Sequence, residues 1–235
     1  MYWIFRLKLL PNLPLLIREA SGIRQNGIKL PALAERVSLG IGTSTILILG
    51  ESTAAGVGAN NLENTLAGHF HRILGSSRRI ENIGKNGLTV GKTYEYYRKS
   101  GFFQYGKIGG LILFLGANDC FKLTSPSTFS QQLKCLIDQI SSELNPDWIY
   151  LADIPPVHLF PAFSDKLRSF LQTQRTFLQR EMILLSQSNQ KIVFDPISLD
   201  LSPEFFSEDQ IHPSDLGYQK IAEFAFEGLI KRNLL

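Results

Sequence analysis

The sequence predicts an α/β fold in which a mainly parallel sheet carries helices on both faces. Short aliphatic runs alternate five times with longer segments of helical periodicity, as in proteins built from strand–helix units. The runs are apolar throughout, which is typical of strands buried on both faces. Glycine and polar residues follow several of these runs, at the edge of the sheet where such folds bind ligands.

Five segments have the composition of buried strands. The first, TILIL, and the third, GLILFL, are β-branched and aliphatic, and a glycine ends each of them. The fourth stops just before a pair of prolines, which cannot donate to a sheet ladder. The five predicted strands span residues 45–49, 79–83, 110–115, 147–152 and 191–194.

Five segments have the apolar spacing of helices that pack on a sheet. Four aliphatic side chains of residues 129–144 recur at intervals of three and four and so share one face. The last segment opens with Pro-Ser-Asp, which is typical of a helix start. The predicted helices span residues 64–74, 93–99, 129–144, 164–186 and 213–231.

Residues 1–44 are expected to be a lead-in segment, followed by one domain over residues 45–235. The apolar residues 1–17 contain Arg6 and Lys8 and are too short and interrupted to span a membrane. Their order of charged and apolar residues also differs from that of a cleavable signal peptide. Two interpretations stay open. We favour a helix packed on the domain's own surface over an apolar helix that lies on a membrane with its basic residues facing lipid phosphates.

Composition excludes several classes of protein. The chain has 235 residues, 24 basic and 21 acidic, and a formal net charge of +3, which is too small to indicate nucleic-acid binding. Its two cysteines, Cys120 and Cys135, lack the spacing of a zinc cluster or a disulfide scaffold. We expect a cytoplasmic protein, with peripheral membrane contact through residues 1–17 as the alternative. The sequence predicts no oligomeric state.

Four polar segments stand at the predicted strand ends or just before the last helix. They are the Gly-Glu-Ser of residues 50–52, the glycine-rich residues 84–87, the Gly-Ala-Asn-Asp of residues 116–119, and residues 209–212. Because the carboxyl ends of parallel strands meet at one edge of a sheet, we expect these segments to converge.

The chemistry of these segments favours a serine nucleophile. A serine hydroxyl is weakly nucleophilic and needs a neighbouring base. Of the four histidines, only His212 has an aspartate, Asp209, three residues before it. That spacing lets the carboxylate hold the imidazole Nδ1 and leaves Nε2 for Ser52. The backbone N–H groups of Ser52 and Gly87 and the side-chain amide of Asn118 are suitable donors to an oxyanion.

In this order, the four segments resemble the motif blocks of the SGNH (GDSL-type) hydrolase superfamily, over roughly residues 45–231. The resemblance implies a flavodoxin-like three-layer α/β/α sandwich with a mainly parallel five-stranded sheet. It also implies ester, thioester or acetyl-sugar hydrolysis without a metal or organic cofactor. The site residues that it implies are the nucleophile Ser52, the base His212, its orienting acid Asp209, and the oxyanion-hole residues Ser52, Gly87 and Asn118.

One departure from the family pattern is Glu51, which stands where aspartate is usual. It removes no reacting atom, and its role is left open. Among the remaining histidines, His69 and His71 are expected to be solvated on a helix. His158 lies in a Pro- and Phe-rich stretch, residues 155–163, for which a lid or acyl-binding wall and an ordinary apolar loop are equal alternatives.

The sequence therefore predicts a serine hydrolase, an esterase or lipase, that cleaves carboxylic esters through an acyl-serine intermediate. Its expected partner is a small-molecule or lipid ester. Two alternatives remain: an acyltransferase that uses the same acyl-enzyme, and a catalytically inactive binding module of the same fold. A phosphate-binding loop around Lys92 is disfavoured because Asn86 stands where that motif needs glycine.

Overall fold

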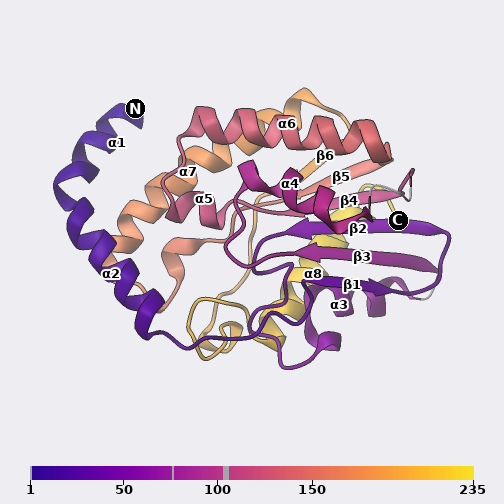
Figure 1. Cartoon of the computed structure of the whole chain (residues 1–235), viewed down its shortest axis with the longest axis horizontal. Helices are drawn as coiled ribbons and strands as arrows, with labels where there is room; N and C mark the ends of the chain where they lie inside the picture. The colour runs from indigo at the N-terminus through magenta and orange to yellow at the C-terminus, as the bar shows by residue number, and fades with distance from the viewer. Residues whose placement is uncertain (1, 76, 103–105) are drawn as a thin grey trace.

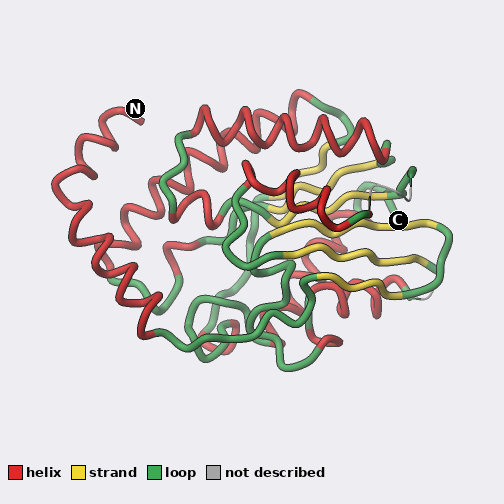
Figure 2. Tube along the Cα trace, viewed as in Figure 1, coloured by secondary structure: helices red, strands yellow, loops and turns green. Residues whose placement is uncertain are grey.

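The computed structural model describes residues 2–75, 77–102 and 106–235. These residues form an α/β sandwich in which a sheet lies between two groups of helices (Figures 1 and 2). The sheet has the order β1-β3-β2-β4-β5-β6, and all neighbouring strands are parallel except the β1–β3 pair. The α/β fold with a mainly parallel sheet is thus confirmed.

The buried strands are those that the sequence predicts. Residues 46–49 of β2 are fully buried, and each such aliphatic side chain contributes about 1.5–3 kcal/mol relative to its exposed state. The strands are β1 (Arg36–Leu39), β2 (Ser44–Gly50), β3 (Arg78–Gly84), β4 (Gly110–Phe114), β5 (Trp148–Ala152) and β6 (Ile192–Asp195).

The prediction of five strands is wrong by one, because β1 adds a sixth. β1 pairs antiparallel with β3, and Arg36 lies opposite Ile83. It is a four-residue edge strand that alternates between exposed and half-buried positions, so it lacks the apolar run that marks the other strands. The sheet therefore begins inside residues 1–44, the stretch expected to precede it.

Helices cover the two faces of the sheet unequally. α4, α6 and α7 share a core with Leu47 and Leu113, whereas α3 and α8 pack with Ile48 and Ile112 on the opposite face. The bounds are α3 (Leu66–Leu74), α4 (Val90–Ser100), α5 (Ala117–Phe121), α6 (Pro126–Leu144), α7 (Asp165–Ser188) and α8 (Asp215–Ile230). Short 3₁₀ helices are η2 (Leu62–Asn64), η4 (Val157–Leu159) and η5 (Pro203–Phe205).

Serine caps begin three of these helices. The hydroxyls of Ser125, Ser164 and Ser214 each accept the backbone N–H of the third residue that follows, which satisfies a donor that the helix cannot. α4 starts three residues earlier than the sequence predicts. The reason is a remote cap, because the carboxylate of Asp119 accepts the N–H of Val90 at 3.0 Å.

The N-terminal segment folds as two helices, α1 (Tyr2–Leu9) and α2 (Leu13–Asn26), joined by the 3₁₀ turn η1 (Leu10–Asn12). Met1 lies outside the described residues. α1 contacts α7. α1 and α2 lie on the side of the molecule toward which the parallel strands point (Figure 1). Within the described ranges, no helix combines the length and apolarity that crossing a membrane requires.

Candidate active site

Ser52 lies in a tight turn directly after β2. The N–H of Glu51 donates to Phe114 O at 2.9 Å, and the N–H of Val57 donates to Ser52 O at 3.1 Å. Gly50 precedes this turn because a Cβ there would lie 2.4 Å from Phe114 O. The turn therefore holds Ser52 half-buried at the carboxyl edge of the sheet.

Asp209 and His212 form a closely bonded pair in the loop before α8. Asp209 Oδ2 lies 2.5 Å from His212 Nδ1. The other oxygen, Oδ1, accepts the N–H groups of His212 at 2.9 Å and Ile211 at 3.0 Å and the hydroxyl of Ser207 at 2.9 Å. The carboxylate thus fixes both the loop and the orientation of the imidazole.

The hydrogen bonds also determine the charge of Asp209. Burial alone would raise the pKa of its carboxyl group. The hydrogen bonds from His212 and Ile211, together with the charge of His212, outweigh burial and lower the pKa to about 2. Asp209 is therefore ionised throughout the neutral range and can stabilise a protonated imidazole.

Contacts across the fold join the turn that carries Ser52 to the loop that carries the histidine. Asp215, at the start of α8, accepts the backbone N–H of Asn60 at 2.9 Å and the side-chain amide of Asn64 at 2.8 Å. The hydroxyl of Tyr218 donates to Val57 O at 2.8 Å. These hydrogen bonds connect the chain that follows Ser52 to the first turn of α8, directly after the loop that carries His212.

Asn118, the predicted oxyanion donor, is held by Glu51. Glu51 Oε2 accepts the backbone N–H of Asn118 at 2.9 Å and its side-chain amide at 2.5 Å, while Oε1 accepts the N–H of Ala117 at 2.8 Å. Burial raises the pKa of Glu51 to about 7, although these donors act in the opposite direction. The second amide hydrogen of Asn118 stays available to another acceptor.

Gly87 lies in the turn after β3, with the positive φ of 77° that favours glycine. The N–H of Lys85 donates to Gly50 O at 3.1 Å, which brings this turn beside the one that carries Ser52. The adjacent Asn86 lines the cavity described below, whereas Gly87 is not among its lining residues. Of the predicted site residues, Gly87 and Asp209 are not in the cavity wall, and Asp209 reaches the site through its contact with His212.

A cavity of about 180 Å³ lies between three of the candidate site residues. Ser52, Asn118 and His212 line it together with Glu51. The rest of the wall is largely apolar and includes Phe121, Pro155, Pro156, Phe160, Ile197, Leu201, Phe205, Ile211 and Ile221. The Pro- and Phe-rich stretch therefore forms part of a cavity wall, which sequence alone left as one of two alternatives.

Other candidate groups have structural environments. His69, expected to be solvated, is buried on α3, and burial lowers its pKa. Asp119 is buried and bonds the N–H of Val90 and, at 2.9 Å, the hydroxyl of Thr124. Cys120 is buried with a raised pKa, again because of burial. Among the described residues, no group of three or more His, Cys, Asp or Glu side chains could hold a metal ion.

Comparison with known proteins establishes the family. Residues 48–220 match the model of the GDSL-like lipase/acylhydrolase family, and the match includes every predicted site residue. The chain therefore belongs to this family and is an enzyme of the ester-hydrolase class. The comparison with curated proteins gave no match.

Solved structures share the fold at low sequence identity. The aryl esterase of M. smegmatis is 17% identical with a TM-score of 0.64, over 82% of this chain and 100% of the other. A member of the lipolytic G-D-S-L family from Veillonella parvula is 14% identical with a TM-score of 0.64, over 79% and 97%. A carbohydrate acetylesterase family member from Sinorhizobium meliloti is 16% identical with a TM-score of 0.60, over 82% and 99%. These likenesses support the three-layer hydrolase fold.

Proposed function

We propose that the protein hydrolyses carboxylic esters through an acyl-enzyme on Ser52. The observation that carries the proposal is the Asp209–His212 pair, at 2.5 Å, with His212 lining the same cavity as Ser52. Such a pair leaves the far imidazole nitrogen free to accept the serine proton. His212 is then the general base and Asp209 its orienting carboxylate.

The steps follow from this arrangement. Ser52 Oγ attacks the ester carbonyl carbon while His212 takes the hydroxyl proton, and the carbonyl oxygen becomes an oxyanion. The proposed donors to this charge are the N–H of Ser52, the side-chain amide of Asn118 and the N–H of Gly87. His212 then protonates the leaving alcohol. Water, deprotonated by the same imidazole, releases the acid and restores the serine.

The cavity supports a small apolar acyl or aryl group. Its volume of about 180 Å³ only slightly exceeds the roughly 150 Å³ of an apolar protein cavity that accepts benzene. Phe121, Phe160 and Phe205 contribute three aromatic faces to its wall. We therefore propose that short-chain or aryl esters react faster than long-chain esters.

Hydrolysis of nitrophenyl acetate, butyrate and octanoate by wild type and Ser52→Ala tests the mechanism. We expect turnover by wild type, a loss of at least a thousandfold in Ser52→Ala, and a fall in kcat/KM from butyrate to octanoate. Labelling with a fluorophosphonate should add one mass adduct to wild type and none to the variant. Equal rates in wild type and Ser52→Ala would rule out the acyl-serine.

A further inference from the structure

The outer surface of α1 and α2 is unusually apolar. Thirteen large hydrophobic side chains are exposed among the described residues, and seven of them lie within the first 28 residues. This stretch also lies outside the family-matched residues 48–220. The seven side chains are Trp3, Ile4, Leu7, Leu10, Leu15, Ile17 and Ile28. We call the surface formed by these seven residues the outer face of α1–α2.

α1 carries apolar side chains on two sides, and the rest of the protein covers only one of them. Phe5 is buried against α7, where its ring centroid lies 5.8 Å from that of Phe177, and the ring of Tyr2 meets Phe177 edge-on at 5.2 Å. Trp3 points the other way and is 72% exposed. A helix on a protein surface normally carries polar residues on its solvent side, so α1 has the composition of a helix covered on both sides.

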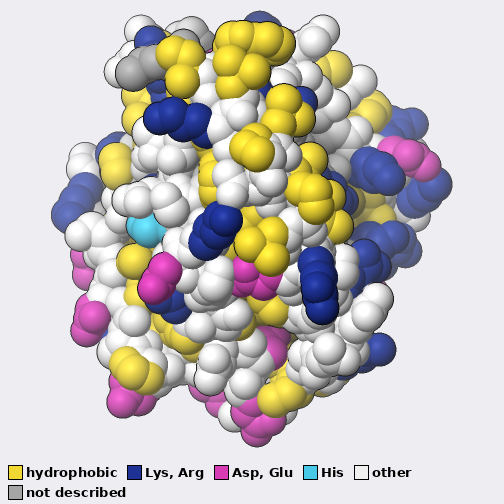
Figure 3. Space-filling model, turned by 90° about the vertical axis from the view of Figure 1, so that its left-hand side faces the viewer, with side chains coloured by type: hydrophobic (Ala, Val, Ile, Leu, Met, Phe, Trp, Pro, Cys, Tyr) yellow, Lys and Arg dark blue, Asp and Glu magenta, His cyan; other side chains and the backbone are white. Residues whose placement is uncertain are grey.

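Basic side chains accompany the apolar ones. Residues 1–29 contain five Lys and Arg and a single acid, Glu19, so their formal charge is +4 against +3 for the whole chain. Glu19 already binds the backbone N–H and hydroxyl of Ser164, each at 2.8 Å. All five basic side chains, Arg6, Lys8, Arg18, Arg24 and Lys29, are exposed. Figure 3, which views this side of the molecule, shows hydrophobic side chains gathered along it with Lys and Arg among them.

The same helices border the active site. Arg24 and Ile28 line a hollow whose other walls include Asn86, Asp209 and His212. In Figure 1, α1 and α2 lie on the side of the molecule toward which the parallel strands point. A surface that covers the outer face of α1–α2 would therefore lie close to the entrance of the site.

We propose that the outer face of α1–α2 docks on an anionic lipid surface. Apolar side chains with interspersed cations are the composition by which helices lie at a lipid interface, since the chains enter the headgroup region and the cations pair with phosphates. A second copy of this chain fits less well, because a two-fold contact through this face would bring two +4 segments together. The proposal does not depend on which ester is cleaved.

Tryptophan fluorescence gives a direct test, because the chain has only two tryptophans and they differ in exposure. Trp3 is 72% exposed, whereas Trp148 is buried in β5. With vesicles of phosphatidylcholine and phosphatidylglycerol, we expect the emission of the full chain to shift to the blue and brominated lipid to quench it. Trp3→Phe should abolish the shift, and vesicles of phosphatidylcholine alone should give at least tenfold weaker binding.

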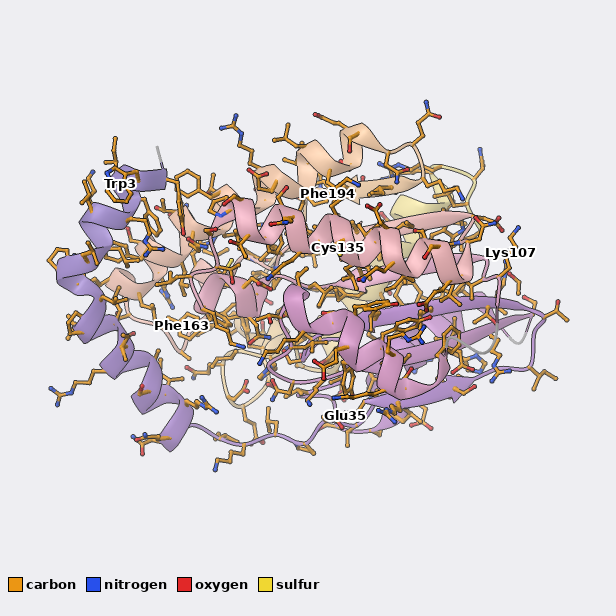
Figure 4. All side chains as sticks on the ribbon, turned by 45° about the horizontal axis from the view of Figure 1, so that its top comes forward. Trp3, Glu35, Lys107, Cys135, Phe163 and Phe194 are labelled. Atoms are coloured by element: carbon orange, nitrogen blue, oxygen red, sulfur yellow. The ribbon has the colours of Figure 1, made fainter. Side chains whose placement is uncertain are left out.

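Vesicle flotation with matched variants tests the two components of the surface. Trp3→Gln/Leu7→Gln, which leaves the charge unchanged, should lower the bound fraction at least tenfold, whereas Ile41→Gln, which alters an apolar and 92% exposed side chain between β1 and β2, should bind as wild type. Arg6→Gln/Lys8→Gln should weaken binding about 25-fold, at roughly fivefold for each of the two charges. Lys107→Gln/Lys134→Gln removes the same charge elsewhere and should change binding less than twofold. Figure 4 shows Trp3 and Lys107 at opposite ends of the molecule.

Three results would overturn the proposal. They are failure of wild type to float with anionic vesicles, equal flotation of wild type and Trp3→Gln/Leu7→Gln, and a soluble dimer that this double variant dissociates without any vesicle binding by wild type. Since Trp3 and Leu7 are exposed, this double variant should keep the thermal unfolding midpoint of wild type. Circular dichroism verifies that its helices remain folded.

Discussion

Glu51 and Asn118 are joined by two hydrogen bonds to a single carboxylate oxygen. Oε2 of Glu51 accepts the backbone N–H of Asn118 at 2.9 Å and its side-chain amide at 2.5 Å. Glu51 is adjacent to Ser52 and buried, so one carboxylate positions the proposed oxyanion donor from beside the proposed nucleophile. This contact gives a role to the residue that stands where the family pattern has aspartate.

Replacing Glu51 by glutamine should lower activity more than replacing it by aspartate. The amide group of Glu51→Gln would place a donor against one of the three donors from Ala117 and Asn118. At pH 8, above the pKa of about 7 at which Glu51 ionises, we expect kcat on nitrophenyl butyrate to fall about 10- to 100-fold, and the free energy of unfolding by about 1–3 kcal/mol, because a buried donor loses its partner.

Glu51→Asp is the conservative comparison, since it keeps the carboxylate and shortens the side chain by one methylene. It should retain most of kcat while KM stays within about threefold of wild type. If Glu51→Gln and Glu51→Asp lose kcat equally, the carboxylate does not position Asn118 in the manner described.

The pKa of Glu51 predicts an unusual pH dependence of stability. Burial raises this pKa from 4.5 to about 7, so between these values the folded protein binds a proton that the unfolded chain does not. The contribution of Glu51 to the free energy of unfolding is fully present below pH 4.5 and is lost as pH rises toward 7. Subtracting the free energy of unfolding of Glu51→Gln from that of wild type should give a difference that falls between pH 4.5 and 7.5.

Asp209 titrates in a lower pH range than Glu51, so the effects of the two groups on stability can be separated. Its pKa is lowered from 3.8 to about 2, so its stabilisation is present above pH 3.8 and is lost as pH falls toward 2. Urea unfolding at pH 5, 6 and 7.5 therefore reports on Glu51 and not on Asp209. A wild-type minus Glu51→Gln difference that stays flat over these three pH values would contradict the assignment.

Asn118→Ala should remove an oxyanion donor. Loss of one such donor typically lowers kcat by 10²–10³, because the missing hydrogen bond acts in the transition state and hardly at all in the ground state. Asn86→Ala is the matched control, since Asn86 lines the same cavity and has no proposed part in the reaction. A decrease of similar size in both variants would point to a general disturbance of the cavity.

The sequence predicted the residues of the site whose chemistry is local. Asp209 and His212 are three residues apart, so their pairing depends on one loop, and the strand ends followed from apolar runs such as residues 45–49. The contact between Glu51 and Asn118 was not predictable in the same way. These residues are 67 positions apart and meet only because β2 and β4 are neighbours in the sheet.

The elements that the sequence missed also depend on distant partners. β1 is too short to show an apolar run and is defined by its pairing with β3. The early start of α4 depends on a cap from Asp119, which lies beyond the end of the next strand. For Gly87 the sequence motif predicts a role in the site, but the cavity wall contains its neighbour Asn86 instead.

The size of the cavity predicts that Phe121→Ala changes acyl-chain preference. Phe121 lines the cavity and is 39% exposed, so its removal should widen the acyl pocket with little loss of core packing. We expect the ratio of kcat/KM for nitrophenyl octanoate to that for the acetate to rise about tenfold, which matches the 1–3 kcal/mol that small changes in an apolar pocket provide. Leu216→Ala is the control, because Leu216 on α8 is equally exposed and is not among the residues that line the cavity. An unchanged ratio in Phe121→Ala, or an equal rise in Leu216→Ala, would show that the acyl group binds outside this cavity.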